Sequence, residues 1–187
     1  VLEDRNHKRI ITKDNSGSTA VLVTISTTEF IITNIGDSRA VLAMEERGEE
    51  REREREGKRL KAVAMTTDHK LSIPEERERA IAAGGIVELI SAQDPSMGWE
   101  VRANGHSTRL RMSRSLGDFY LKTCEERERE KQIVTADPEI RIYQRTEKEV
   151  FILLACDGVF DVMSNQEAVD NIARSLGYYE ERERERE

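Results

Sequence analysis

Short runs of β-branched and other apolar residues, separated by polar breaks, dominate the first half of the sequence. Runs that return about every eight to twelve residues predict an antiparallel sheet, because parallel βαβ units need long helical crossovers between their strands. This spacing constrains the fold more than any other feature of the chain. The strands expected here span Thr19–Ile25, Glu29–Ile35, Ser38–Met44 and Ala62–Thr66.

The second half alternates further strands with helices and one long loop. Its expected strands are Ile86–Ile90, Glu139–Tyr143 and Glu149–Cys156. The last is almost entirely apolar, which predicts a central, buried strand. Residues Ser91–His106 are rich in Gly, Ser, Pro, Asn and Asp, and a loop of this length in a compact domain is usually functional or disordered.

Two helices are expected, over Pro74–Ala83 and Gln166–Leu176, each stopped by a following glycine. Both starts have capping-box spacing, Ser72 with Glu75 and Ser164 with Glu167. Two helices among about seven or eight strands predict an α+β or layered β-sandwich fold.

Four Glu/Arg-rich runs account for the unusual charge of the chain. They hold 19 of its 37 acidic and 11 of its 30 basic residues, so the net charge of −7 does not describe a binding surface. Glu75–Arg79 continues into Ala80-Ile81-Ala82-Ala83 and is expected to be helical. The other runs have no apolar face and are expected to be solvated loop segments and a tail, with an interaction tail as the alternative. These runs are 45–56, 125–130 and 180–187.

Several classes of protein are excluded by the same inspection. No apolar stretch approaches the ~18 residues of a membrane span, and the basic residues form no stripe with aromatics, so neither a membrane nor nucleic acid is expected as a partner. The N-terminus has no signal-peptide core and no Met, which favours an excised or processed piece. Cys124 and Cys156 lie in dissimilar contexts, so we expect no disulfide and an intracellular location, cytoplasmic or nuclear.

Three aspartates stand beside a glycine at the end of an apolar stretch: Gly36-Asp37, Gly117-Asp118 and Asp157-Gly158. A carboxylate at a strand end can project into a cleft, and the glycine lets the backbone turn sharply. Converging carboxylates suit Mg²⁺ or Mn²⁺ better than Zn²⁺. A plain β-turn is the commonest use of an Asp-Gly pair and remains the alternative for each.

Six segments that occur in order resemble a known family. They are Ser16–Val21 (SGSTAV), Asn34–Leu42 (NIGDSRAVL), Thr67–Lys70 (TDHK), Arg77–Val87, Met112–Phe119 (MSRSLGDF) and Leu153–Val169 (LLACDGVFDVMSNQEAV). This combination is similar to the metal-dependent serine/threonine protein phosphatases of type 2C. The resemblance implies an α-β-β-α sandwich of antiparallel sheets flanked by helices. It also implies hydrolysis of phosphoserine and phosphothreonine in phosphoproteins by a water held between metal ions.

The resemblance also assigns roles to single residues. It implies two Mn²⁺ or Mg²⁺ ions, with Asp157 and Asp118 as carboxylates of the two-metal centre and Asp37 beside a third, weaker ion. Gly36, Gly117 and Gly158 support these aspartates. Asp161 is expected to have a structural hydrogen-bonding role, and His69 a structural rather than catalytic one. The 91–106 loop corresponds to the variable flap beside the cleft, a candidate for substrate choice.

The motifs that open the family are missing from this chain. These are a phosphate-binding Arg, a Met-Glu-Asp segment, and an Asp-Gly-His-Gly-Gly segment that contains the proposed general-acid histidine, so no catalytic residue is located here. The sequence therefore resembles the C-terminal two-thirds of the catalytic domain over residues 1–179. One sheet is expected to lack strands and to expose apolar surface unless a missing N-terminal segment or another chain completes the fold. We expect little activity from this chain by itself.

Two other interpretations of the chain stay open at this point. A pseudophosphatase would use the same fold as a binding or scaffold module, although all three Asp/Gly sites are retained. The repeated Glu/Arg filler also suggests a designed or chimeric chain. The sequence upstream of Val1 would discriminate between an enzyme and a scaffold.

Overall fold

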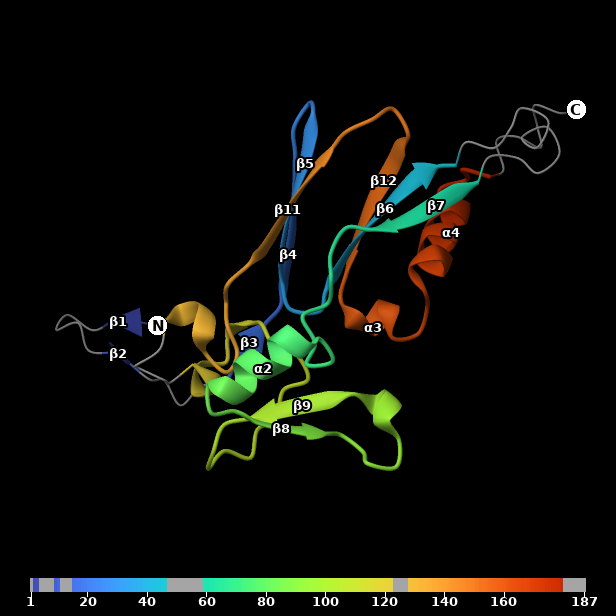
Figure 1. The fold of residues 1–187 in the computed structure, drawn as a ribbon. Coiled ribbons are helices and arrows are strands. Elements are labelled where there is room, and N and C mark those ends of the chain that lie inside the picture. Colours follow the sequence, from blue (N-terminus) through green and yellow to red (C-terminus); the bar gives the residue numbers. More distant parts are fainter. Residues whose placement is uncertain (1, 4–8, 11–14, 47–58, 123–127, 180–187) are drawn as a thin grey trace, which may run out of the picture. The chain divides into compact units, whose positions relative to one another are not determined.

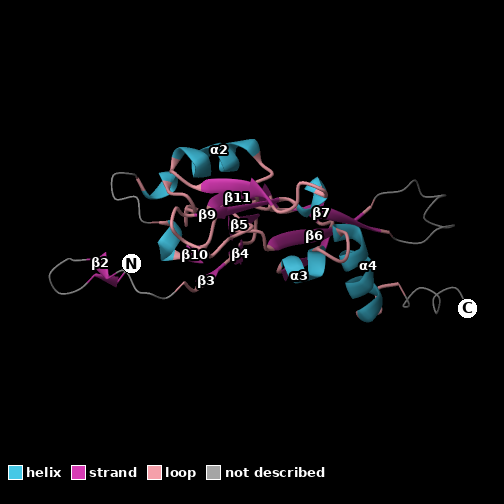
Figure 2. Cartoon of the chain, turned by 90° about the horizontal axis from the view of Figure 1, so that it is seen from below, coloured by secondary structure: helices cyan, strands magenta, loops and turns pink. Residues whose placement is uncertain are grey.

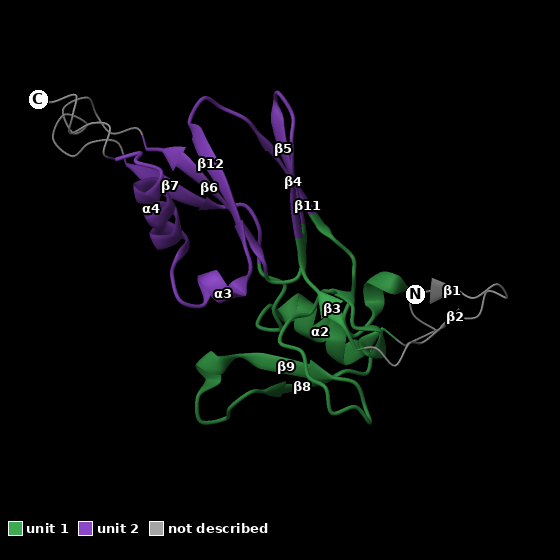
Figure 3. Ribbon diagram, turned by 180° about the vertical axis from the view of Figure 1, so that it is seen from behind, with its two compact units in different colours: residues 1–20, 34–37, 68–139 green, residues 21–33, 38–67, 140–187 purple. Residues whose placement is uncertain are grey.

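The structure is a computed structural model, and it describes residues 2–3, 9–10, 15–46, 59–122 and 128–179 (Figure 1). The chain forms two compact units, each assembled from three segments (Figure 3). Unit 1 comprises residues 1–20, 34–37 and 68–139, and unit 2 comprises residues 21–33, 38–67 and 140–187.

Seven strands precede the first helix in the described part of the chain, and strands and helices are mixed after it (Figure 2). The strands are β1 (Leu2–Glu3), β2 (Arg9–Ile10), β3 (Gly17–Ser18), β4 (Ala20–Ile25), β5 (Glu29–Ile35), β6 (Arg39–Glu45), β7 (Leu60–Ala64), β8 (Ile86–Leu89), β9 (Trp99–Arg102), β10 (Leu116–Gly117), β11 (Glu139–Gln144) and β12 (Glu149–Ala155). The α-helices are α2 (Pro74–Ala82), α3 (Asp157–Phe160) and α4 (Asn165–Ser175), and the 3₁₀ turns are η1 (Pro95–Met97), η2 (Phe119–Leu121) and η3 (Arg129–Lys131). The predicted α+β class is confirmed.

Unit 2 is built on two three-stranded sheets, ordered β11-β5-β4 and β12-β6-β7. Apolar side chains from both sheets pack together between them, among them Phe30 and Ile32 of β5 and Leu42 of β6. On its other face, the β12-β6-β7 sheet packs against α3 and α4, where Val169 is fully buried. This half of the chain is therefore a layered sandwich with helices on one side.

Strand β6 holds this sandwich together because both of its faces are buried. Leu42 points into the space between the sheets, whereas Val41 and Ala43 pack under the helices. In the sheet, β6 pairs antiparallel with β12 on one side and with β7 on the other, where Leu42 lies opposite Val63. The unbroken apolar run Ala40–Ala43 suits a strand that is covered on both faces.

The prediction that the strand over Glu149–Cys156 is central was wrong. Among the described strands, β12 and β7 are the edge strands of this sheet, and β6 takes the centre. Leu154 and Val150 of β12 are exposed, so this apolar run is not fully buried. Hydrophobicity could not separate the two strands, because both are almost entirely apolar.

The two helices start differently. The Ser164–Glu167 capping box of α4 is confirmed, with both reciprocal hydrogen bonds present. The Ser72–Glu75 box at α2 was wrong: Ile73 is the N-cap residue, and its side chain makes no capping bond. Pro74 occupies the first turn, so the helix starts one residue later than the box requires and Glu75 is not at the capping position.

Unit 1 contains a β-hairpin where the sequence predicted a loop over Ser91–His106. Strand β9 lies inside this segment and pairs antiparallel with β8, with Trp99 opposite Leu89. Val101 of β9 is fully buried in the core of unit 1. The surrounding Gly, Ser and Asp residues hid a short strand whose alternating pattern is visible only over Trp99–Arg102.

The Glu/Arg runs lie partly outside the described residues. In the first run, Glu45 ends β6 and its carboxylate accepts a hydrogen bond from Tyr178. In the run over 125–130, Arg129 and Glu130 belong to η3. Residues 47–58 and 180–187 lie outside the described part, so the loop and tail predictions for them stay predictions.

Apolar side chains are exposed on the outer face of the β11-β5-β4 sheet, as the sequence led us to expect. Leu22, Ile140 and Ile142 alternate with inward-pointing residues and are each more than half exposed. Val21, Val23 and Tyr143 point the other way, into the layer between the sheets. Among the described residues, the hydrophobic packing of this sheet therefore comes from its inner face.

This difference between the two faces predicts different costs of mutation. Leu42→Ala should lower the free energy of unfolding by about 2–5 kcal/mol, because it leaves a cavity between the sheets. Ile142→Thr, on the outer face of β11, should change it by no more than about 0.5 kcal/mol. Urea unfolding of the two variants measures both values, and equal losses would contradict the description of the outer face as unpacked.

Candidate functional site

Asp37 lies in a tight turn directly after β5. Gly36 adopts a φ of +102°, and a side chain there would collide with Thr19, whose Cγ2 would lie 2.3 Å from an added Cβ. Only glycine adopts this conformation without strain. Asp37 itself is 4% exposed, and its Oδ2 lies 4.0 Å from the Lys70 ammonium. The turn therefore buries a carboxylate, and the Lys70 ammonium is a cation beside it.

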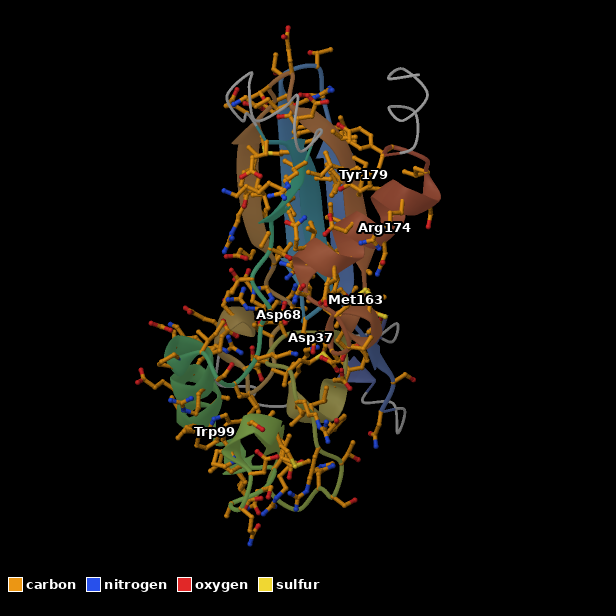
Figure 4. All side chains as sticks on the ribbon, turned by 90° about the vertical axis from the view of Figure 1, so that its right-hand side faces the viewer. Asp37, Asp68, Trp99, Met163, Arg174 and Tyr179 are labelled. Atoms are coloured by element: carbon orange, nitrogen blue, oxygen red, sulfur yellow. The ribbon has the colours of Figure 1, made fainter. Side chains whose placement is uncertain are left out.

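Asp68 is a second carboxylate at this place, and the sequence reasoning missed it. Lys70 Nζ lies 3.5 Å from Asp68 Oδ2, so this ammonium is shared by Asp68 and Asp37. Figure 4 shows the two aspartates close together, one from the end of β5 and the other from the segment after β7. The signal was available: Asp68 also follows an apolar strand, but no glycine adjoins it.

His69 connects these two segments. Its imidazole Nδ1 accepts a hydrogen bond from the Gly36 backbone N–H at 3.1 Å. The backbone N–H of His69 donates to the Gly36 carbonyl at 3.0 Å. Burial, followed by the charge of Arg114, lowers the pKa of His69, which favours the neutral imidazole that can accept at Nδ1. The expected structural role of His69 agrees with these contacts.

A buried carboxylate network supports this part of unit 1. Glu76 of α2 is 6% exposed and accepts hydrogen bonds from Arg114 at 2.6 and 3.1 Å, and from Arg79 at 2.6 Å. Ser113 also donates its hydroxyl to Glu76. Burial raises the pKa of Glu76, but the Arg114 and Ser113 hydrogen bonds and the Arg79 charge outweigh it and lower the pKa to about 2. Glu76 and Arg79 belong to a Glu/Arg run, and here Glu76 is buried while Arg79 is partly buried beside it.

Asp118 occupies a separate turn of unit 1, where β10 pairs with β3. Its backbone is left-handed, with a φ of +49°, and its N–H donates to the Ser16 carbonyl at 2.8 Å. The carboxylate lies against the bare backbone of Gly17, where an added Cβ would fall 1.8 Å from Asp118 Oδ2. It is 5% exposed, and among the described residues it makes no hydrogen bond or ion pair.

The charge of the Asp118 carboxylate affects the pKa of two neighbouring groups. Burial lowers the pKa of Lys122 to about 8, and the Asp118 charge offsets part of that shift. Lys122 Nζ donates to the Ser115 carbonyl at 2.7 Å and also to the Gly117 carbonyl. These two hydrogen bonds stabilise the backbone of the turn. Burial, followed by the Asp118 charge, raises the pKa of Tyr120 to about 12. Neither group forms an ion pair with Asp118.

Asp157 belongs to unit 2, at the point where β12 gives way to α3. It is the first residue of α3 and is half-buried, and its carbonyl accepts the Asp161 N–H at 2.7 Å. Gly158 follows it inside the helix, where an added Cβ would meet only Cys156 Sγ at 3.6 Å. The preceding Cys156 is a free, exposed thiol, and Cys124 lies outside the described residues. The convergence of Asp157 with Asp37 and Asp118 stays a prediction.

The donor chemistry of these turns fits a hard divalent cation, although the ligand set is incomplete. Asp118 is 5% exposed and its carboxylate has no hydrogen-bonding partner among the described residues, so a cation beside it would compensate its charge. The glycine backbone beside it leaves the space that a ligand needs. Within the described residues, however, no three His, Cys, Asp or Glu side chains are grouped as metal ligands. The same part of the chain contains no helix long and apolar enough to cross a membrane.

The chain combines an antiparallel α+β fold with buried carboxylates at glycine turns. Comparison with known proteins shows which family has this combination. Residues 2–184 match the family Protein phosphatase 2C, and the chain belongs to this family. It is 42% identical over 166 residues to "Probable protein phosphatase 2C T23F11.1" of Caenorhabditis elegans, covering 88% of this chain and 39% of that protein. It is 38% identical over 163 residues to "Protein phosphatase 1B" of Rattus norvegicus, covering 87% and 35%.

The solved structures lead to the same family. The serine-threonine phosphatase 2C from Toxoplasma gondii has a TM-score of 0.69 and 26% sequence identity, covering 88% of this chain and 49% of that one. A second phosphatase from a Toxoplasma gondii strain has a TM-score of 0.55 and 30% identity, covering 80% and 40%. The chain thus spans less than half the length of these relatives.

The Glu76 network predicts a dependence of stability on pH. The folded-state pKa of Glu76 is lowered from 4.5 to about 2, so its stabilising contribution is present above about pH 4.5 and is lost as the pH falls toward 2. Glu76→Gln should lower the free energy of unfolding at pH 7 by about 3 kcal/mol, because Arg114 and Arg79 lose their counter-charge. The variant should also lose much of the decline between pH 4.5 and 2.

Urea unfolding at pH 7 and at pH 3 measures both effects. Glu128→Gln is the matched control, because Glu128 pairs with Lys131 at 2.7 Å on the exposed surface. The control should leave the unfolding midpoint unchanged at both pH values. A Glu76→Gln variant that behaves like this control would show that the buried network does not contribute to stability.

Proposed function

We propose that the protein to which this chain belongs is a metal-dependent phosphatase that hydrolyses phosphoserine and phosphothreonine in phosphoproteins. Membership of the family supports the activity. The observation that carries the metal dependence is Asp118, a buried carboxylate in a left-handed turn that faces the Gly17 backbone and has no hydrogen-bonding partner among the described residues. We also propose an intracellular, cytoplasmic or nuclear, location.

Asp37, Asp118 and Asp157 are the residues that we assign to holding Mn²⁺ or Mg²⁺. When bound, a divalent cation supplies Lewis-acid activation of water and neutralises charge on the transferring phosphoryl group. The chain's own contribution is to hold the carboxylates in place before the cation arrives. His69 and Gly36 fix the Asp37 turn, and Lys122 fixes the Asp118 turn through backbone carbonyls.

We assign the β8-β9 hairpin to contacts with the phosphoprotein substrate. Trp99 of this hairpin packs under the Arg77 guanidinium, which lies 4.9 Å from the ring centroid. Arg109 pairs with Glu100 and Glu88 across the same hairpin. These contacts give the hairpin a defined shape while its tip, which includes Met97, stays exposed. Differences in this tip would then distinguish substrates.

A pseudophosphatase that acts as a binding or scaffold module is the second candidate. The observation in its favour is that no three potential ligands are grouped within the described residues. Dephosphorylation of a phosphothreonine peptide by the whole natural protein with Mn²⁺ separates the two. Turnover that chelation abolishes supports the enzyme, whereas peptide binding without turnover supports the scaffold.

This chain by itself should turn over para-nitrophenyl phosphate with Mn²⁺ only weakly. It lacks the opening motifs that the family resemblance associates with phosphate binding and with further metal ligands. A colorimetric assay against the whole protein at equal concentration measures the difference. Rates within about twofold of each other would show that those motifs are not needed.

Asp118→Asn should weaken Mn²⁺ binding to this chain at least about tenfold, since the loss of a ligand costs at least as much as the loss of a supporting group. Gly17→Ala should have a similar effect without touching the carboxylate itself, because its methyl group would displace Asp118. Asp94→Asn is the matched control: Asp94 lies on the exposed hairpin, and its Oδ1 accepts the Ser96 N–H, a bond that asparagine also makes.

Isothermal titration with MnCl₂ measures these affinities. We expect the control to bind as the unmodified chain does. If Asp118→Asn binds Mn²⁺ as tightly as the control, Asp118 is not a ligand.

A further inference from the structure

The Gly36-Asp37 turn is not fixed by its own backbone preferences. Gly36 has the freedom of a residue without a side chain, and its φ of +102° is one state among many that it can adopt. Asp37 follows directly, so any rotation at Gly36 would swing the carboxylate away. The turn therefore needs external contacts to keep one conformation.

His69 supplies two of these contacts from a distant part of the sequence. The imidazole accepts the Gly36 N–H at Nδ1, and the His69 N–H donates to the Gly36 carbonyl. The backbone N–H and carbonyl of Gly36 are therefore both hydrogen-bonded to His69. A third contact is local, since the Asn34 side-chain amide donates to the same Gly36 carbonyl at 3.1 Å.

His69 can act in this way because it is itself held firmly. It is 3% exposed, and its carbonyl accepts both the Ser113 N–H at 2.8 Å and the Ser113 hydroxyl at 3.0 Å. Ser113 is in turn bonded to Glu76, at the centre of the buried arginine network. The His69 backbone is therefore linked through Ser113 to the hydrogen-bonded network around Glu76.

We propose that His69 is a positioning residue: its Nδ1 acceptor fixes the Gly36-Asp37 turn and thereby holds the Asp37 carboxylate ready for a divalent cation. This inference rests on the proposed function for its consequence, namely cation binding. The link to Gly36 does not depend on it. A histidine that merely filled space in the core would need no particular ring nitrogen.

The choice of nitrogen makes the proposal testable in the unmodified chain. If Nδ1 accepts the Gly36 N–H, the ring proton sits on Nε2, which ¹⁵N chemical shifts of the imidazole report directly. A proton on Nδ1 at pH 7.5 would overturn the proposal without any variant.

Three substitutions then separate positioning from packing. His69→Asn places a side-chain oxygen near the position of Nδ1, His69→Gln places it near Nε2 instead, and His69→Leu removes the acceptor. Hydrogen exchange of the Gly36 amide should stay within about threefold of the unmodified chain in His69→Asn. It should accelerate about five- to tenfold in the other two, as the loss of one hydrogen bond predicts. The Val101 amide, bonded to the Leu110 carbonyl elsewhere in unit 1, is the internal control and should not change.

Titration with MnCl₂ completes the test and keeps it distinct from the proposed function. Positioning predicts about tenfold weaker Mn²⁺ binding in His69→Gln and His69→Leu, with recovery in His69→Asn. Faster Gly36 exchange with unchanged Mn²⁺ affinity would show that His69 does not place Asp37 for cation binding. Equal exchange in His69→Asn and His69→Leu would overturn the Nδ1 contact. A failure of the whole natural protein to bind Mn²⁺ would refute the proposed metal site, while the Gly36 exchange would still decide the contact itself.

Discussion

The ion pairs of the buried Glu76 carboxylate are the interactions on which the Asp37 turn of the candidate site depends. The carboxylate neutralises two arginines that come from different segments, Arg79 of its own helix and Arg114 of the chain before β10. A charge in the interior is tolerated only when hydrogen bonds and counter-charges surround it, and here both carboxylate oxygens are used. Through Ser113 and His69 this rigidity reaches the Gly36 turn, so a distant ion pair determines how well Asp37 is placed.

Much of the fold could be predicted from the sequence because local patterns determine it. Glu29–Ile35 has the same bounds in the sequence prediction and in the structure, and the Ser164–Glu167 capping box is present as expected. These features involve neighbouring residues only. The choice of β6 over β12 as central strand is different, because it depends on which strand finds partners on both sides, and that is a property of the whole sheet.

The candidate site was predicted less completely, for a related reason. Asp37 and Asp118 were found because each adjoins a glycine, and both turns prove to need that glycine's conformational freedom. Asp68 has no such neighbour, and it is recognised only because Lys70 brings it to Asp37. The run Glu75–Arg79 was expected to be helical and lies in α2, but composition gave no sign that Glu76 is buried and paired with Arg79 in the network that supports the site.

The contact between Gly17 and Asp118 links two positions that are far apart in the chain. A side chain at position 17 would meet the Asp118 carboxylate, so a larger residue there requires that carboxylate to move. A relative that has given up the carboxylate would no longer need a glycine there, and mutation would fill the position with larger residues. The identity of this one small residue is therefore a marker, readable from sequence alone, of whether a related protein still maintains the buried charge.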